Sequence, residues 1–117
     1  MLVTQTEVFN VPAALDTILQ LREVNSYQRT FYFKNLSDST LTLVIQESDD
    51  GGNTWEDLVS AFTVGAAGAG SDVEVKNVTS SNILRVQASG GGNDRDLYIS
   101  SARFYLDSNH VWARPLL

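Results

Sequence analysis

One eight-residue segment, 48–55, gathers the side chains with the clearest capacity for chemistry; it reads Ser-Asp-Asp-Gly-Gly-Asn-Thr-Trp. Asp50 can accept backbone N–H bonds across a tight loop, and Gly51 and Gly52 allow the positive φ angles that such a loop requires. Trp55 is expected to pack beneath the loop. The spacing favours a folded structural turn, with a ligand or metal contact as the alternative.

The same segment carries a local resemblance. Its residues fit every fixed position of the pattern S-x-D-x-G-x-T-W, through Ser48, Asp50, Gly52, Thr54 and Trp55. The segment resembles the Asp-box of sialidases and related β-propeller proteins. In that family the box is a repeated structural hairpin away from the catalytic centre, so the resemblance implies turn geometry and not glycoside hydrolysis. This chain has one copy, and no catalytic residue carries over to it.

Calcium is the metal to weigh for this region, because hard cations prefer several oxygens on one loop. The oxygens would come from Asp49, Asp50, Glu56 and Asp57. Their spacing is not that of an EF-hand, so solvated turn acids are favoured and no metal or other cofactor is predicted. Farther along, Asp94 and Asp96 flank Arg95; they could form a second acidic cluster or a surface ion pair, and the ion pair is favoured.

Nucleophilic catalysis would require a base beside a nucleophile. The single histidine, His110, follows Ser108 by two residues, which is too close in sequence to imply a triad. A paired-carboxylate site needs a deep cleft that a small sandwich seldom offers. An enzyme is therefore not predicted.

Length and composition fit one compact domain, residues 1–117, with 43% hydrophobic residues. The absence of cysteine excludes disulfides and thiolate chemistry. A net charge of −6 without a basic run argues against nucleic acid as a partner. No apolar run is long enough for a membrane span or signal peptide, so a soluble protein is expected.

Apolar residues alternate with polar ones along most of the chain, which is the pattern of half-buried strands. Strands are expected at 2–9, 28–35, 40–47, 54–59, 72–76, 84–88 and 96–106. Short polar turns predict two hairpins, one joining 28–35 to 40–47 and the other joining 72–76 to 84–88. The last strand changes phase, which predicts a bulge near Ser100-Ser101.

Residues 13–24 fit either a strand or a helix, and the all-β context favours the strand. The expected fold is all-β: a single antiparallel β-sandwich, jelly-roll or immunoglobulin-like, of about eight strands with apolar terminal arms.

The two ends of the chain are apolar, which is unusual because fraying termini are generally polar. Residues 1–11 and 107–117 are possible arms that stay soluble by docking on their own domain or on a neighbour. Tyr32 and Tyr105 fall on the outward parity of their strands, beside Lys34 and Arg103. The candidate partner-binding residues are Leu2, Val3, Val8, Phe9, Tyr32, Tyr105, Trp112, Leu116 and Leu117.

Taken over its length, the chain resembles the small β-sandwich proteins of tailed-bacteriophage virions, particularly capsid decoration (cement) proteins. The resemblance rests on Phe-Tyr-Phe-Lys-Asn-Leu at 31–36, the 48–55 turn, and Leu-Arg-Val-Gln-Ala-Ser-Gly-Gly at 84–91 followed by a long strand. It implies a homo-oligomer, with a trimer favoured, that binds the major capsid protein on the virion surface after synthesis in the host cytoplasm. The alternative is a carbohydrate- or receptor-binding module of a phage tail or fibre.

Overall fold

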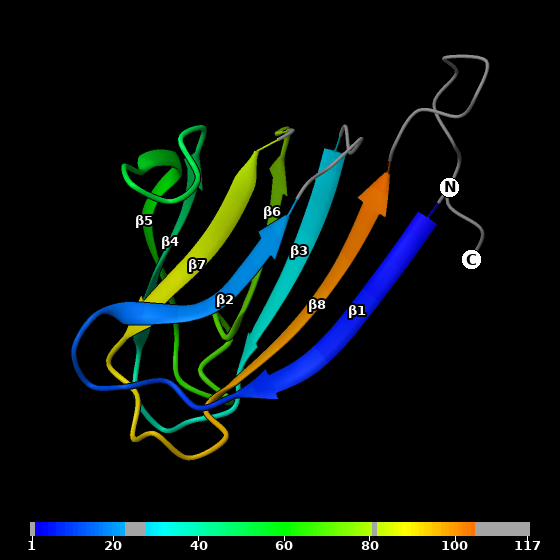
Figure 1. Ribbon diagram of the computed structural model, residues 1–117. Coiled ribbons are helices and arrows are strands. Elements are labelled where there is room, and N and C mark those ends of the chain that lie inside the picture. The colour runs from blue at the N-terminus through cyan, green and yellow to red at the C-terminus, as the bar shows by residue number, and fades with distance from the viewer. Residues whose placement is uncertain (1, 23–27, 81, 105–117) are drawn as a thin grey trace.

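The computed structural model describes residues 2–22, 28–80 and 82–104. These residues form eight β-strands in two layers (Figure 1). The strands are β1 (Leu2–Phe9), β2 (Asp16–Arg22), β3 (Gln28–Asn35), β4 (Leu41–Ser48), β5 (Glu56–Val64), β6 (Val73–Val78), β7 (Ile83–Ser89) and β8 (Leu97–Phe104). No helix able to span a membrane occurs in this part of the chain.

Each layer is a four-stranded antiparallel sheet, with strand orders β1-β8-β3-β6 and β2-β7-β4-β5. Consecutive strands from β1 to β4 alternate between the two sheets, and so do β5 to β8, while β4 and β5 are paired in one sheet. This nesting of two Greek keys is the jelly-roll arrangement. An all-β sandwich is thus confirmed, and of the two topologies considered the chain adopts the jelly roll.

The core lies between the sheets because every second side chain of the central strands points inward. Phe31 and Phe33 on β3 are fully buried, and their rings stack with centroids 5.5 Å apart. Leu43 and Ile45 on β4 and Val86 on β7 face them from the other sheet.

Neither predicted hairpin forms, because each pair of strands is divided between the two sheets. The chain leaves β3 at Asn35, which is fully buried. The Asn35 side-chain amide donates to the carbonyl oxygens of Ser39 (2.7 Å) and Val64 (3.1 Å), and its oxygen accepts from Ser37 N (2.8 Å). The polar turn therefore makes a corner between layers, where the sequence pattern suggested a return within one layer.

The predicted bulge in the last strand is also wrong. β8 pairs with β1 and β3 without a register shift. At this end of the sheet the inward positions are polar: Arg29 and Ser101 are buried, and Arg29 Nη1 donates to Ser101 Oγ at 2.7 Å. The apolar residues change parity because the interior becomes polar, and no extra residue is needed.

All the strands expected from the sequence form, and one of them is displaced along the chain. The ambiguous segment forms strand β2, with an irregularity between Thr17 and Leu19. The strand expected at 54–59 begins at Glu56 and continues to Val64, because Thr54 and Trp55 belong to the preceding turn. The N-terminal segment 2–9 forms an edge strand beside β8.

Candidate interaction face

The acidic turn between β4 and β5 is held by hydrogen bonds among its own residues. Ser48 Oγ donates to Asp50 Oδ1 (2.7 Å) and accepts from Gly52 N (2.8 Å). Asp50 also accepts from Thr54, through the backbone N at 2.9 Å and Oγ1 at 2.5 Å. The Thr54 hydroxyl, then its backbone N–H, then the Ser48 hydroxyl lower the pKa of Asp50 to about 2. The turn consequently keeps a carboxylate that is ionised at neutral pH and already engaged on both oxygens.

The aromatic residue of the turn, Trp55, also makes contacts within the protein. Trp55 Nε1 donates to the Gly52 carbonyl at 3.1 Å, and the Arg85 guanidinium lies 4.1 Å from the centroid of the Trp55 ring. Arg85 Nε donates in turn to Gln46 Oε1 at 2.8 Å. Within the described residues, no three acidic or histidine side chains converge as a metal site. This arrangement can fix the β4–β5 connection, and it presents no assembled reaction centre.

A second carboxylate, Asp96, lies where a surface ion pair was expected, and that expectation is wrong. Asp96 is 4% exposed and accepts backbone N–H bonds from Val11 (2.9 Å), Asp94 (3.0 Å) and Gly92 (3.3 Å). Burial alone would raise the pKa of Asp96, but these amide donors outweigh burial and lower it. Asp96 therefore ties the β7–β8 loop to the chain segment between β1 and β2. The Gly-Gly-Gly-Asn run before it, at 90–93, was the available sign of such an amide-lined loop.

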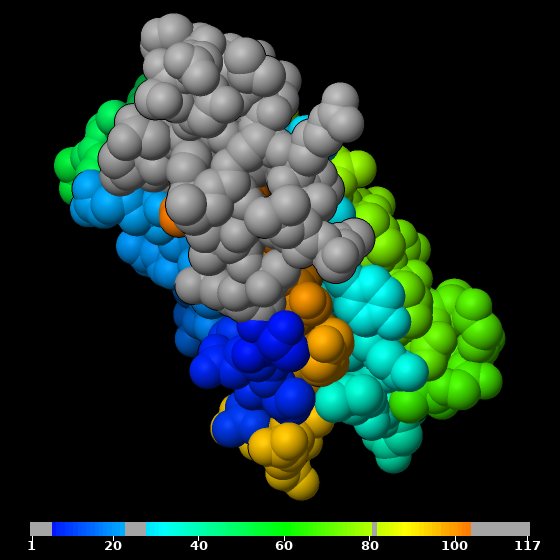
Figure 2. Space-filling model, turned by 90° about the vertical axis from the view of Figure 1, so that its right-hand side faces the viewer, coloured from blue at the N-terminus to red at the C-terminus, as the bar shows by residue number. Residues whose placement is uncertain are grey.

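The outer face of the β1-β8-β3-β6 sheet is defined by the register of its strands. Residues opposite one another in an antiparallel pair lie on the same face. Because Phe31 and Phe33 point inward, the alternate positions point outward: Thr6, Val8, Thr30, Tyr32, Lys34, Val73, Val75, Asn77, Tyr98, Ser100 and Ala102. Figure 2 looks onto this face, where β1, β8, β3 and β6 run side by side in blue, orange, cyan and yellow-green.

This outer face is almost uncharged, although the protein carries a net charge of −6. Of the positions named, only Lys34 is charged. Tyr32 and Tyr98 are half-buried and meet edge to face with ring centroids 6.0 Å apart. Val73 and Val75 remain 38% and 52% exposed. Hydroxyl and apolar groups with few charges are the composition expected at the centre of a protein interface.

Strand β6 contributes to this face by turning its valines outward. Glu74 and Lys76 lie opposite Phe33 and Phe31, so they point to the side of the sandwich interior. Lys76 Nζ lies 4.7 Å from the Phe62 ring centroid and 3.7 Å from Glu74 Oε2. The charged residues of β6 therefore seal the β5/β6 side of the sandwich, and its apolar residues face solvent.

The opposite sheet has an outer surface of different character. Gln46 Nε2 donates to Asp57 Oδ1 at 2.8 Å, and the neighbouring Arg85 bonds the same glutamine. Gln87 Nε2 donates to Thr17 Oγ1 at 3.4 Å. Polar groups also bond to one another on the outer face of the β1-β8-β3-β6 sheet, where Thr30 Oγ1 donates to Asn77 Oδ1 at 2.6 Å. The two surfaces differ in charge, because this one carries Asp57 and Arg85.

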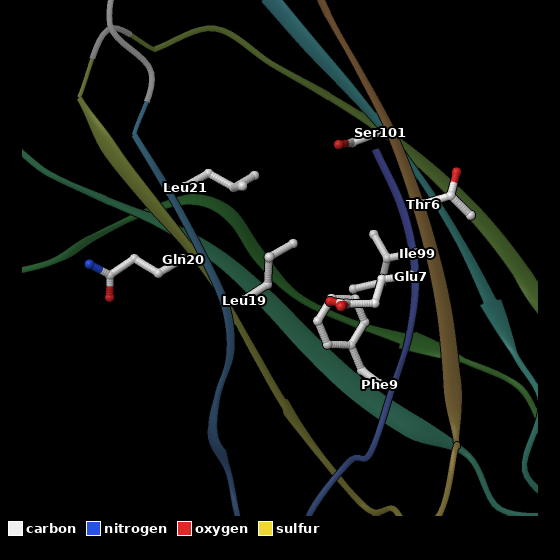
Figure 3. Close-up of a pocket in the computed structure, with 8 residues that line it drawn as sticks. All are labelled: Thr6, Glu7, Phe9, Leu19, Gln20, Leu21, Ile99 and Ser101. Carbon is white, nitrogen blue, oxygen red and sulfur yellow. The ribbon is translucent and has the colours of Figure 1, made fainter. Parts of the chain in front are cut away.

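A cleft of about 480 Å³ opens between the sheets along β1 and β2 (Figure 3). Phe9 and Ile99 line it from one sheet, and Leu19 and Leu21 line it from the other. The Glu7 side chain points into the cleft, whereas Thr6 and Gln20 point away from it. Its mixture of apolar walls and one carboxylate contains no paired catalytic groups.

The candidate partner-binding residues are only partly within the described structure. Tyr32 and Val8 lie on the outer face, and Phe9 lines the cleft. The register places Leu2 and Val3 at the start of β1. Lying outside the described residues are Tyr105, Trp112, Leu116, Leu117 and the rest of the expected C-terminal arm. Sequence reasoning missed Tyr98, Val73 and Val75, whose outward parity depends on the register with β3.

No protein-family model matches the chain, and no curated protein is significantly similar to it. Solved structures with a similar fold exist at low sequence identity. A chain described under "Bacillus endospore appendages form a novel family of disulfide-linked pili" has a TM-score of 0.59 and 13% identity, covering 92% of this chain and 88% of that one. A chain of the "Acidic stable capsid structure of Helicobacter pylori bacteriophage KHP30" has a TM-score of 0.50 and 12% identity, covering 98% and 93%. These likenesses show a shared fold.

Proposed function

We propose that this protein is a structural virion protein of the capsid-decoration type, which binds the outer capsid lattice through the outer face of the β1-β8-β3-β6 sheet. The observation that carries the proposal is the nearly uncharged character of that face in a strongly acidic protein. Tyr32 and Tyr98 provide its aromatic centre, and Val73 and Val75 extend it to the edge of the sheet.

Binding of this kind would act through contact area and would need no reaction. Burial of the tyrosine and valine side chains supplies affinity, and the acidic remainder of the surface keeps unbound copies soluble. A copy that contacts two neighbouring molecules of the major capsid protein would hold them together against separation. Two solved structures that share the fold are described as a phage capsid and as pili, which are assemblies of many protein copies.

Co-sedimentation with capsids assembled without this protein tests the proposal. The native chain should pellet with the capsids at micromolar concentration and raise the temperature at which they release their genome. Val75→Asp places a negative charge on the outer face and should weaken binding at least about tenfold, since a buried unpaired charge is costly. Thr63→Asp is the matched control, because Thr63 is exposed on β5 of the other sheet.

If the native chain does not bind the capsids, or if the two variants weaken binding equally, the outer face is not the capsid-binding surface.

The second candidate function is carbohydrate or receptor binding by a module of a phage tail or fibre. The Tyr32–Tyr98 pair favours it, because tyrosine rings combine an apolar face with a hydroxyl group. A glycan array with and without calcium separates the two functions: a sugar-dependent signal that Tyr32→Ala abolishes would support the module.

A further inference from the structure

The four edge strands of the sandwich differ in how they are protected against pairing with another strand. Exposed edges are commonly guarded by bulges, charged residues or inward-pointing charges. β2 has an irregularity after Thr17 and charged residues at both ends, Asp16 and Arg22. β5 has two register shifts against β4 and begins with two acids. β6 points Glu74 and Lys76 toward the interior.

Strand β1 is the least guarded of these edges. All eight of its residues pair with β8 in an unbroken register, from Leu2↔Phe104 to Phe9↔Leu97. It contains no proline and no bulge, and its one inward-pointing charge is Glu7, whereas β6 has two. Its other edge has no strand beside it within the described part of the chain. A regular and nearly uncharged edge of this length is a template for an added strand.

We infer that β1 pairs antiparallel with β1 of a second copy of this chain across a two-fold axis, which joins two β1-β8-β3-β6 sheets into one eight-stranded sheet. A two-fold contact uses the same edge on both copies, whereas a trimer would have to pair β1 with one of the guarded edges. This inference does not rest on the proposed capsid function, and it proposes a dimer in place of the trimer that the resemblance to decoration proteins implies.

The position of Glu7 selects the register of this pairing. When a two-fold axis perpendicular to the sheet relates two antiparallel β1 strands, residues whose side chains point to the same face of the sheet lie opposite one another. With the axis at Thr6, Thr6 lies opposite its own copy and Glu7 lies opposite Gln5 of the second copy. In this register the single charge of the strand does not meet its own like charge. With the axis at Glu7, the two carboxylates would be directly opposed.

Sedimentation equilibrium of the full chain, together with two strand variants, tests the inference. The native protein should have twice the monomer mass, with a monomer–dimer equilibrium. Thr6→Lys puts two like charges opposite each other and should raise the dimer Kd at least about tenfold. Gln5→Lys puts a lysine opposite Glu7 in both halves and should lower the Kd by about threefold. Thr63→Lys on the β5 edge is the matched control and should leave the Kd unchanged.

Hydrogen exchange gives an independent reading of the same contact. The outward backbone amides of β1 should exchange at least about tenfold more slowly in the dimer than in Thr6→Lys, whose circular dichroism must match the native protein. A trimer, or a native chain still monomeric at about 1 mM, overturns the inference. So does a Gln5→Lys variant that weakens the dimer, or a Thr63→Lys variant that weakens it as much as Thr6→Lys.

Discussion

Replacing Asp96 by asparagine should destabilise the fold strongly while nearly preserving the shape of the side chain. Asp96 is buried, and its two oxygens accept three backbone N–H groups from Val11, Asp94 and Gly92. In Asp96→Asn one oxygen becomes an N–H donor that faces another N–H donor. The remaining bonds also lose the charge of the carboxylate.

The size of the effect follows from the number of bonds changed. If the amide oxygen takes the Oδ2 position, Val11 and Asp94 keep neutral bonds, and Gly92 N loses its acceptor. A hydrogen bond to a charged group contributes about 1.5–3 kcal/mol and a neutral one about 0.5–1.5 kcal/mol. Two weakened bonds, at about 1–1.5 kcal/mol each, and one lost bond give a decrease of about 4–5 kcal/mol in the free energy of unfolding. This is a large part of the about 5–15 kcal/mol that a domain possesses.

The effect should depend on pH in a defined direction. Amide donors hold the pKa of Asp96 below its usual value of 3.8 in the folded state. The carboxylate therefore contributes stability that is fully present above the unfolded pKa and is lost as the pH falls through the folded pKa. The difference between the native protein and Asp96→Asn should be constant near neutral pH and should narrow below about pH 4. The pKa of Asp50 is also lowered, but Asp50 is present in both proteins, so its contribution to the pH dependence cancels in the difference.

Urea unfolding followed by circular dichroism measures both quantities at a series of pH values. The midpoint should fall in Asp96→Asn with little change in slope. Asp94→Asn is the matched control: Asp94 is exposed, its backbone N–H is retained, and the change should stay within about 0.5 kcal/mol. A loss below about 1 kcal/mol in Asp96→Asn, or a difference that does not narrow in acid, would refute this account of the loop.

Three further predictions concern the loop, the turn and the core. Gly91→Ala should cost about 2–3 kcal/mol in urea unfolding, because a Cβ there would overlap the backbone carbonyl and side chain of Val11. Thr54→Val removes the hydroxyl that contributes most to lowering the pKa of Asp50, so an NMR titration should find that pKa raised from about 2 toward 3.8. Phe33→Ala should cost about 4 kcal/mol by thermal unfolding, since its ring is fully buried and lies 5.5 Å and 5.6 Å from two other rings.

The sequence was sufficient to predict the class of the fold because alternation is a local property. Residues 84–88 alternate between buried and half-buried positions, and in 28–35 buried positions alternate with half-buried or exposed ones. The partner of each strand is not local. The polar turn at 35–39 is compatible with a hairpin or with a corner, and the buried side chain of Asn35, bonded to Val64 across 29 residues, makes it a corner. Long-range bonds of this kind leave no periodic pattern in the sequence.

The candidate site was only partly predictable for the same reason. Tyr32 could be assigned to an outward position from its own strand. The outward position of Val75 depends on its pairing with Tyr32, because β6 reverses the usual rule and turns its charges inward. The burial of Asp96 could not be predicted from the local sequence, because one of its amide partners is Val11, 85 residues earlier.

The pairing of the first strand with the last has a consequence for how the chain folds during synthesis. Leu2 lies opposite Phe104, so β1 has no partner in its sheet until residues 97–104 have left the ribosome. Until then β1, in which Leu2, Val3, Val8 and Phe9 are apolar, lacks the hydrogen bonds that β8 provides. Contacts between such distant residues fold slowly, typically in milliseconds to seconds. We therefore expect newly made chains to pass through a stage in which chaperones can bind this segment.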